Sequence, residues 1–383
     1  MNDLFPGAGR MPTDDDHSVR PTIPQPLAVD PWIVSSMLQK SIRRGDADLA
    51  ERAAITLHRL RGNGIWRRLI VIGFEDIGVA SVEALIQTTA ACTAPSWRAN
   101  VEGGDQRVLC LLARLLAEAP KDRSPDHLIG VAHSHPALED ARHRVGALPI
   151  AQRLDLVSNA SRPLPERAVA AWYASGIEWG TERRAGRGDL PSLMSAFRHL
   201  GVPDDPVTAT RIAATRTREP IVVMTPLLWL AASATGVHRI VECSLPPVTM
   251  IGDVPSYAFD MHTAVGKAAI HRFARENHAV RDVLAAYVPE HRAKDAACIA
   301  AFHVDAAPVS RRFGWGGSAE LERLGVEADM MTAGVPREGI APLLNVVLEN
   351  LDHLNAIRAK LFSAARSQRG SASQAKSWKR PGV

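Results

Sequence analysis

The chain has 383 residues, of which 46% are hydrophobic and 22% are charged, as expected for a globular protein of two or three domains. This composition excludes collagen-like, mostly disordered and disulfide-scaffold classes, and the four cysteines lie far apart without a CxxC pair, which is typical of a reducing cytosol. The formal net charge of +4 comes from five basic residues after residue 362, because 40 basic and 41 acidic residues precede them.

Both ends of the chain are predicted to be disordered. Residues 1–30 are rich in Pro, Asp and Gly and predict a disordered head, whereas residues 363–383 are rich in Ser, Arg and Lys and predict a disordered basic tail. No leader-like apolar segment occurs near residue 1. The one long uncharged stretch, 220–237, contains Pro226 and Gly236, which favours a buried helix over a membrane span. We therefore expect a cytoplasmic protein with no membrane partner.

Helical periodicity dominates the first part of the folded region. Apolar residues recur at helical spacing, and short connections separate the segments, which is typical of antiparallel helices in a bundle. The expected helices span residues 32–41, 47–60, 65–74, 82–92 and 105–117. Together they predict one helical domain over residues 31–140.

Residues 141–362 are predicted to form a second, mainly helical region of unrecognised type. Its expected helices span residues 163–174, 190–200, 225–234, 262–278, 279–287 and 342–362. Residues 245–257 contain three prolines, and residues 302–317 contain the sequence RRFGWGG, so both segments predict loops. No alternating strand of six or more residues is evident. The predicted fold class is all-α.

Three ordered segments form the most specific pattern in the sequence. They read WIVSSMLQKSIRRGDAD at 32–48, IWRRLIVIGFEDIGVASVEAL at 65–85 and APKDRSPDHLIGVA at 119–132. In this order and spacing they resemble the C-terminal half of the RarA/MgsA family of replication-associated AAA+ ATPases. The residues on that family's pattern are Ser36, Lys40, Ser41, Arg43, Asp46, Arg67, Arg68, Glu75, Asp76, Ile77, Gly78, Ala119, Pro120 and Lys121.

The resemblance implies a helical bundle similar to the oligomerisation collar of clamp loaders. It also implies a homo-oligomer that acts in DNA replication or repair, with DNA and a replisome component or an AAA+ ATPase as partners. The family's phosphate-binding Gly-x-x-x-x-Gly-Lys-Ser/Thr loop does not occur, because Gly266–Lys267 is followed by Ala268 and Met261 replaces the leading Gly. We therefore expect no ATPase activity and no cofactor.

Three groups of residues are candidates for DNA or partner binding, and each has a structural alternative. The first, at the end of the 32–41 helix, could contact phosphate or complement the helix dipole. The second could face DNA or pair with Glu75 and Asp76, which themselves could hold a metal or only satisfy nearby donors. The third could stack on single-stranded DNA or fill a core. These groups are Lys40, Arg43 and Arg44; Arg67 and Arg68; and Arg311, Arg312 and Trp315.

Two histidine-containing segments raise the question of a metal or catalytic site. His133 and His135 form a His-x-His-Pro pattern that also occurs in JAMM-type metalloproteases, but no Ser-x-x-Asp follows, so we expect no metal there. Asp260, His262 and His271 surround the start of a polar helix and are candidate catalytic residues. The alternative is a capped, solvated helix.

The sequence thus leads to two hypotheses of function. The first is a non-enzymatic accessory or adaptor protein of DNA replication or repair, which self-associates through the collar-like domain and contacts DNA. The alternative is a metal-dependent enzyme similar to a phosphodiesterase or nuclease, with its site around Asp260, His262 and His271.

Overall fold

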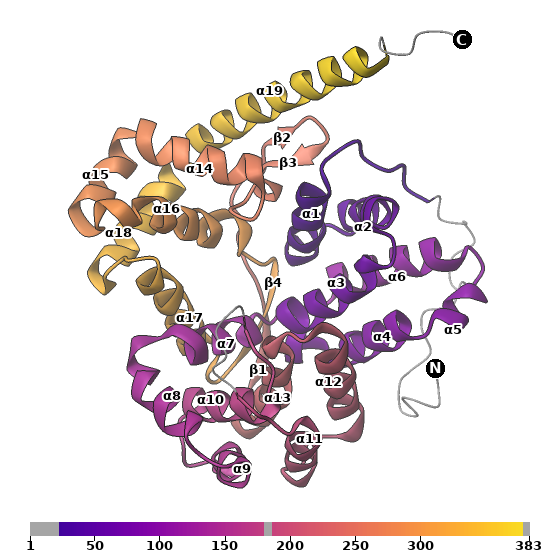
Figure 1. Cartoon of the computed structure of the whole chain (residues 1–383), viewed down its shortest axis with the longest axis vertical. Helices are drawn as coiled ribbons and strands as arrows, with labels where there is room; N and C mark the ends of the chain where they lie inside the picture. The colour runs from indigo at the N-terminus through magenta and orange to yellow at the C-terminus, as the bar shows by residue number, and fades with distance from the viewer. Residues whose placement is uncertain (1–22, 180–185, 378–383) are drawn as a thin grey trace. The chain divides into compact units, whose positions relative to one another are not determined.

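The computed structural model describes residues 23–179 and 186–377. Most of these residues are helical, which confirms the all-α prediction (Figure 1). Within the described ranges, no helix is both long enough and apolar enough to cross a bilayer. The predicted head lies largely outside the described residues. The predicted tail begins inside a helix that continues to Ser377.

The chain folds into two compact units. Unit 1 consists of Met1–Leu245 and Val309–Thr332, and unit 2 consists of Pro246–Pro308 and Ala333–Val383. The predicted domain boundary at residue 140 lies inside a helix of unit 1, Glu139–Gly146. Unit 1 therefore continues well past the collar-like region expected over residues 31–140.

Unit 1 contains fourteen α-helices and a two-stranded antiparallel sheet within its described residues. The helices are α1 (Pro31–Arg44), α2 (Ala47–Arg61), α3 (Gly64–Ile72), α4 (Val82–Thr93), α5 (Pro95–Ala99), α6 (Gly104–Glu118), α7 (Ser124–Ser134), α8 (Glu139–Gly146), α9 (Ile150–Ser158), α10 (Leu164–Ser175), α11 (Leu190–His199), α12 (Asp204–Thr217), α13 (Met224–Thr235) and α17 (Ser318–Thr332). The strands are β1 (His238–Glu242) and β4 (Arg311–Trp315).

The first motif segment forms α1 and the start of α2 because its polar residues terminate both helices. The Asp30 carboxylate accepts a hydrogen bond from the backbone N–H of Trp32 at 2.9 Å, and Pro31 occupies the first helical position. Gly45 ends α1 in the left-handed region at φ 75°. Asp46 then caps α2 by accepting from the N–H of Leu49 at 3.0 Å. Two helices thus follow one another with a turn of two residues.

The core of unit 1 lies where α1, α2 and α6 pack side by side and where α17 packs on α7. Val34, Met37 and Leu38 of α1 are fully buried, as expected from their helical spacing. The α7–α17 contact is close because Gly325 has no side chain: a Cβ there would lie 2.5 Å from Nδ1 of His127. The segment after residue 308 therefore completes the core of unit 1.

Two predicted segments have a different secondary structure in the folded chain. The helix expected over 65–74 ends at Ile72 and continues as a π-helix, Gly73–Ile77, followed by a 3-10 helix, Gly78–Ser81. The loop expected over 302–317 contains a second π-helix, Phe302–Ala306, and strand β4. Both π-helices carry a buried carboxylate, Asp76 in the first and Asp305 in the second. An ion pair fixes each carboxylate, which the helical period alone does not indicate.

Unit 2 is a smaller group of helices with one short hairpin. Its elements are β2 (Met250–Ile251), β3 (Val254–Pro255), α14 (Ala264–Glu276), α15 (His278–Tyr287), α16 (Ala293–Ala301), α18 (Arg337–Glu349) and α19 (Leu351–Ser377). The closing helix predicted over 342–362 is divided at Asn350, whose side chain donates to the carbonyl of Val346 at 2.8 Å and accepts from Asn277 at 2.9 Å. These bonds anchor the break between α18 and α19.

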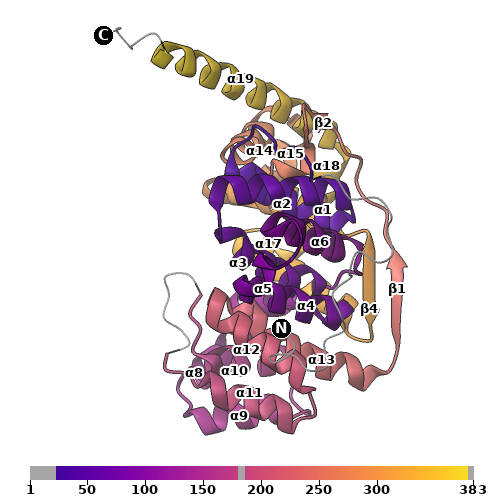
Figure 2. The ribbon, with the colours of Figure 1, turned by 90° about the vertical axis from the view of Figure 1, so that its right-hand side faces the viewer.

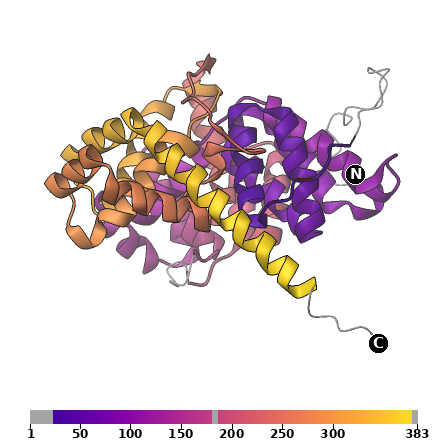
Figure 3. The ribbon, with the colours of Figure 1, turned by 90° about the horizontal axis from the view of Figure 1, so that it is seen from above.

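Helix α19 is fixed to unit 2 by its first three turns. Leu351, Leu354 and Ile357 are buried, and Nη1 of the buried Arg358 lies 2.6 Å from Oδ2 of Asp305. Figure 3 shows the yellow α19 as one long helix whose last turns extend beyond the other helices of its unit. The basic residues Arg366, Arg369 and Lys376 lie within the residue range of this helix.

Candidate functional site

The first group of candidate DNA-binding residues is buried. Lys40, Arg43 and Arg44 lie in the last two turns of α1, and Arg43 is only 1% exposed. Its Nε donates to Oδ1 of Asp76, and its Nη2 donates to Oε1 of Glu75, both at 2.6 Å. Because phosphate cannot reach these side chains, the expectation that this group contacts DNA is wrong. The motif instead places one guanidinium against two carboxylates.

Asp76 is the centre of a buried polar network that joins the three motif segments. Besides Arg43, its carboxylate accepts from Nε2 of Gln39 at 2.8 Å and lies 3.4 Å from Nε of Arg123. Its backbone carbonyl accepts from the N–H of Asp122 at 3.0 Å. Segments 32–48, 65–85 and 119–132 therefore meet around one carboxylate. Glu75 and Asp76 satisfy arginine donors here, in agreement with the structural alternative.

Electrostatics favour the charged form of Arg43 in this network. Burial alone lowers the pKa of the guanidinium, but the carboxylates of Asp76 and Glu75 outweigh it, so the pKa lies above its ordinary value. The neighbouring Asp122 has no such partner, and burial raises its pKa to about 6 against hydrogen bonds from the N–H groups of Ser124 and Val79. The network is therefore anchored by charge at Asp76 and by backbone donors at Asp122.

The second group contacts residues of its own unit. Arg67 is 56% exposed, yet its Nη2 lies 2.8 Å from Oε1 of Glu219, and its Nε donates to the carbonyl of Thr217 at 3.2 Å. Arg68 donates to the side-chain oxygen of Gln39, which in turn binds Asp76. Neither arginine pairs with Glu75 or Asp76 through a described ion pair. Arg67 is the member of this group that solvent can reach.

The third group forms strand β4 instead of a flexible loop. Trp315 is buried, and its indole N–H donates to Oγ of Ser124 at 3.2 Å, so the expectation that it stacks on nucleic-acid bases is wrong. Arg312 pairs with Glu322, and Nη1 of Arg311 donates to the carbonyl of Glu118 at 2.7 Å. Tertiary packing explains this result, because the aromatic side chain fills the core at the N-terminus of α7.

Asp260, His262 and His271 do not come together as a metal site. Oδ1 of the buried Asp260 accepts from the backbone N–H of His262 at 3.0 Å, which forms a turn before α14, and the Thr263 hydroxyl caps that helix at the N–H of Gly266. Desolvation, with Lys267 nearby, lowers the pKa of His271. Within the part of the chain that the structure describes, no three His, Cys, Asp or Glu side chains are grouped to hold a metal ion.

His133 and His135 face different surroundings. Nδ1 of the buried His135 accepts from the N–H of Ala137 at 3.2 Å, and its Nε2 lies 3.5 Å from Oε1 of Glu327. His133 stacks against Trp172 and Trp179, with ring centroids 5.5 and 4.6 Å away. The two rings therefore do not form a pair of ligands for one metal.

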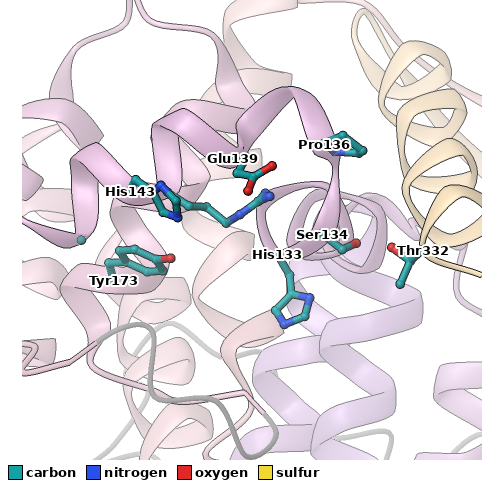
Figure 4. A pocket seen from close by; sticks show the side chains of 9 residues that line it. His133, Ser134, Pro136, Glu139, His143, Tyr173 and Thr332 are labelled. Carbon is teal, nitrogen blue, oxygen red and sulfur yellow. The ribbon is translucent and has the colours of Figure 1, made fainter.

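His133 also lines a pocket of about 790 Å³ in unit 1. Figure 4 shows His143 and Tyr173 on one side of this space and Ser134 and Thr332 on the other. Arg142 is one of the lining residues, and its guanidinium already donates a hydrogen bond to the carbonyl of His135 at 3.1 Å. The sequence pattern indicated His133 but not Tyr173 or Thr332, because α10 and the end of α17 meet this site only in the folded unit.

Strand β1 is the most exposed regular element of unit 1, and sequence analysis missed it. Each of its five residues is exposed, and Ile240 keeps 51% of its surface accessible. It pairs antiparallel with β4, with Ile240 opposite Phe313 (Figure 2). Val237, Ile240 and Val241 are β-branched, which is the signal that could have indicated a strand, but five residues are too few to show alternation.

Comparison with known proteins adds no identification. No family model, no curated protein and no solved structure matches this chain.

Proposed function

We propose that this chain is a non-enzymatic accessory or adaptor protein of DNA replication or repair that self-associates and contacts DNA through its terminal helix. The observation that supports the proposal is the network around Asp76. Three segments that are far apart in the sequence, and that together resemble the RarA/MgsA C-terminal region, meet there through Gln39, Arg43 and Arg123. The network supports the resemblance on which the proposal rests, because Arg43, Glu75 and Asp76 lie on that family's pattern and contact one another in the folded unit.

The charge distribution supports a DNA contact through α19. From residue 363 onward the chain carries five basic residues and no acid. Three of them, Arg366, Arg369 and Lys376, belong to the last turns of α19. Arginine and lysine side chains attract DNA phosphates, and their binding releases counterions from the DNA. The Lys40–Arg44 group cannot serve this purpose, because it is buried.

Fluorescence anisotropy with single-stranded, duplex and forked DNA over a salt series tests this contact. The variant replaces Arg366, Arg369 and Lys376 with Gln in the full chain. We expect its affinity to fall at low salt and the slope of log K against log salt to decrease in magnitude by about 2–3, because about 0.9 counterions are released per phosphate contact. Light scattering on the same samples measures the proposed self-association.

The matched control removes three exposed arginines of unit 1, Arg144, Arg211 and Arg216, which carry the same total charge. The control should retain the salt slope of the unmodified chain within about one contact. An equal loss of DNA affinity in both triple variants would show that binding depends on the net charge of the chain and not on a contact through α19. Absence of binding to all three DNA forms at low salt would overturn the DNA part of the proposal.

A further inference from the structure

The sheet of unit 1 has one closed edge and one open edge. Beyond β4, away from β1, lies Lys121: its N–H donates to the carbonyl of Arg311 at 2.7 Å, and its carbonyl accepts from the N–H of Phe313 at 2.8 Å. The backbone groups of Arg311 and Phe313 thus face Lys121. Because successive residues of a strand direct these groups to opposite sides, Arg312 and Gly314 face β1.

The register of the pair then defines the free groups of β1. Arg239 lies opposite Gly314 and Val241 lies opposite Arg312, so these two residues exchange the hydrogen bonds with β4. The N–H and C=O groups of His238, Ile240 and Glu242 therefore point away from β4. Figure 2 shows β1 as the outer strand of the ribbon.

The side chains of β1 do not protect this edge. Ile240 and Val241 are 51% and 38% exposed, and the preceding Val237 is 69% exposed. Natural sheets usually cover an edge, bend it with a bulge or place lysine or proline on it, because a bare apolar edge pairs with another strand. β1 carries the charged residues Arg239 and Glu242 but neither lysine nor proline, and its register with β4 runs over five pairs without a bulge. The apolar Ile240 lies between the two charged residues, and its N–H and C=O face the open edge.

We propose that β1 pairs antiparallel with β1 of a second copy of this chain, about a two-fold axis at Ile240. The inference deepens the self-association in the proposed function and rests on it, but it names a contact outside residues 31–140. Two copies of the ribbon would form one continuous four-stranded sheet. The contact is isologous, because the same five residues serve both subunits.

The pairing of an imidazole with a carboxylate and the avoidance of facing like charges support a second copy as the occupant and select the register. In its own chain, His238 Nε2 contacts the carbonyl of Ala232 at 2.9 Å, and the exposed Glu242 lies 3.4 Å from Nε of Arg311. With Ile240 on the axis, His238 lies opposite Glu242 of the partner subunit, twice in the dimer, and Arg239 lies opposite the apolar Val241 of the partner subunit. Moving the axis to Arg239 would place two arginines against each other, which is destabilising. Moving it to Val241 would replace the His–Glu pairs by Ile240 opposite Glu242 of the partner subunit.

Sedimentation velocity of the full chain at tens of micromolar tests the pairing with Ile240→Pro. Proline removes the N–H that points to the open edge and no hydrogen bond to β4, so the ribbon itself is retained. We expect the dimer to weaken at least tenfold. Ile240→Thr keeps both the N–H and a β-branched side chain, and it should stay within a few-fold of the unmodified chain.

Oxidative crosslinking tests the register independently of any effect of proline on folding. All four native cysteines are free, and Cys243, the one that is not buried, is changed to Ser in every sample. Ile240→Cys should crosslink, because directly opposed Cα atoms in a hydrogen-bonded pair lie about 5.5 Å apart, within disulfide range. Arg239→Cys should not, because its counterpart is offset by two residues, about 7 Å along the strand.

The outcomes separate this inference from the proposed function. A strictly monomeric chain at tens of micromolar overturns both the inference and the proposed self-association. An oligomer that Ile240→Pro leaves unchanged, and that Ile240→Cys does not crosslink, overturns the inference alone and leaves self-association through residues 31–140. A crosslink at residue 239 but not at 240 overturns the register with Ile240 on the axis and indicates β1 pairing about an axis at residue 239.

Discussion

Asp76 shows how a sequence motif that looks reactive can be structural. A carboxylate with no exposed surface is costly to bury unless donors surround it. Here Gln39 and Arg43 supply those donors, and Nε of Arg123, from a different segment, adds a positive charge 3.4 Å from the carboxylate. The network therefore ties α1 and the start of α7 to the π-helix, and its loss should affect stability more than any surface contact.

We expect Asp76→Asn to lower the free energy of unfolding by about 3–5 kcal/mol, because the change leaves a buried guanidinium without its main counter-charge. Urea denaturation followed by circular dichroism measures the loss. The control is Glu219→Gln, which removes the exposed ion pair with Arg67 and should cost no more than about 1 kcal/mol. Equal losses in the two variants would contradict a structural role for the network.

Lys121 should make the free energy of unfolding depend on pH. Its fully buried ammonium donates to the carbonyls of Ala117 and Ala119, and burial lowers its pKa to about 7, against a partial opposing effect of Asp76. An unfolded lysine has a pKa of about 10.4. Between about pH 7 and 10 the unfolded chain therefore binds more protons, and the free energy of unfolding should rise with pH.

The Lys121→Met variant isolates this effect. Urea denaturation at pH 7, 8 and 9 should show the unmodified chain gaining up to about 1.4 kcal/mol per pH unit relative to the variant. Below pH 7 both states of the lysine are protonated, so the difference should become constant. Parallel pH profiles from pH 7 to 9 would show that Lys121 keeps its ordinary pKa in the folded chain.

At the scale of the element, capping residues made α1 and α2 predictable from the sequence. The π-helix and the β1–β4 pair were not predictable. The Asp-Pro start, the Gly-Asp junction and the apolar spacing all lie within the segment itself. The π-helix at Gly73–Ile77 and the pairing of β1 with β4 depend on partners at distant sequence positions. Local patterns carry no information about such partners, so these elements were assigned to a helix, to a loop or not at all.

Gly45 makes the junction of α1 and α2 testable. Alanine at φ 75° is strained, and its Cβ would lie 3.0 Å from Oγ of Ser310, so Gly45→Ala should cost about 1–2 kcal/mol. Gly64→Ala, at the start of α3, meets nothing nearer than 3.9 Å and should be neutral or stabilise by up to about 1 kcal/mol. Thermal melting of both variants provides the comparison, and a loss at Gly64 as large as that at Gly45 would contradict it.

At the scale of the whole molecule, helical periodicity predicted the fold class but not the division into units. The helices near 32–41, 47–60 and 105–117 were found where expected, because each has a continuous apolar face. The helices that no predicted range covers are α5, α7, α8, α9, α12, α16 and α17. No periodic signal shows that residues 309–332 return to unit 1, since that return depends on contacts with β1 and α7.

The candidate site was the least predictable part for a related reason. Residue type indicated Lys40, Arg43 and Arg44 as a phosphate-binding surface, but burial is decided by the distant Glu75 and Asp76. Trp315 is likewise buried, and its hydrogen-bond partner, Ser124, lies far away in the sequence. Conversely, β1 is too short to show an alternating pattern, although it presents the open edge of the sheet.

The path of the chain has a consequence for synthesis. Residues 246–308 are inserted between β1 and β4, and α17 reaches α7 only after them. While the chain leaves the ribosome, the face of α7 that Gly325 later covers lacks its α17 contact until about eighty residues beyond β1 have been made. Unit 1 is thus the first unit to be synthesised in part and is completed only after residues 246–308. During this interval its exposed apolar surface is prone to aggregation.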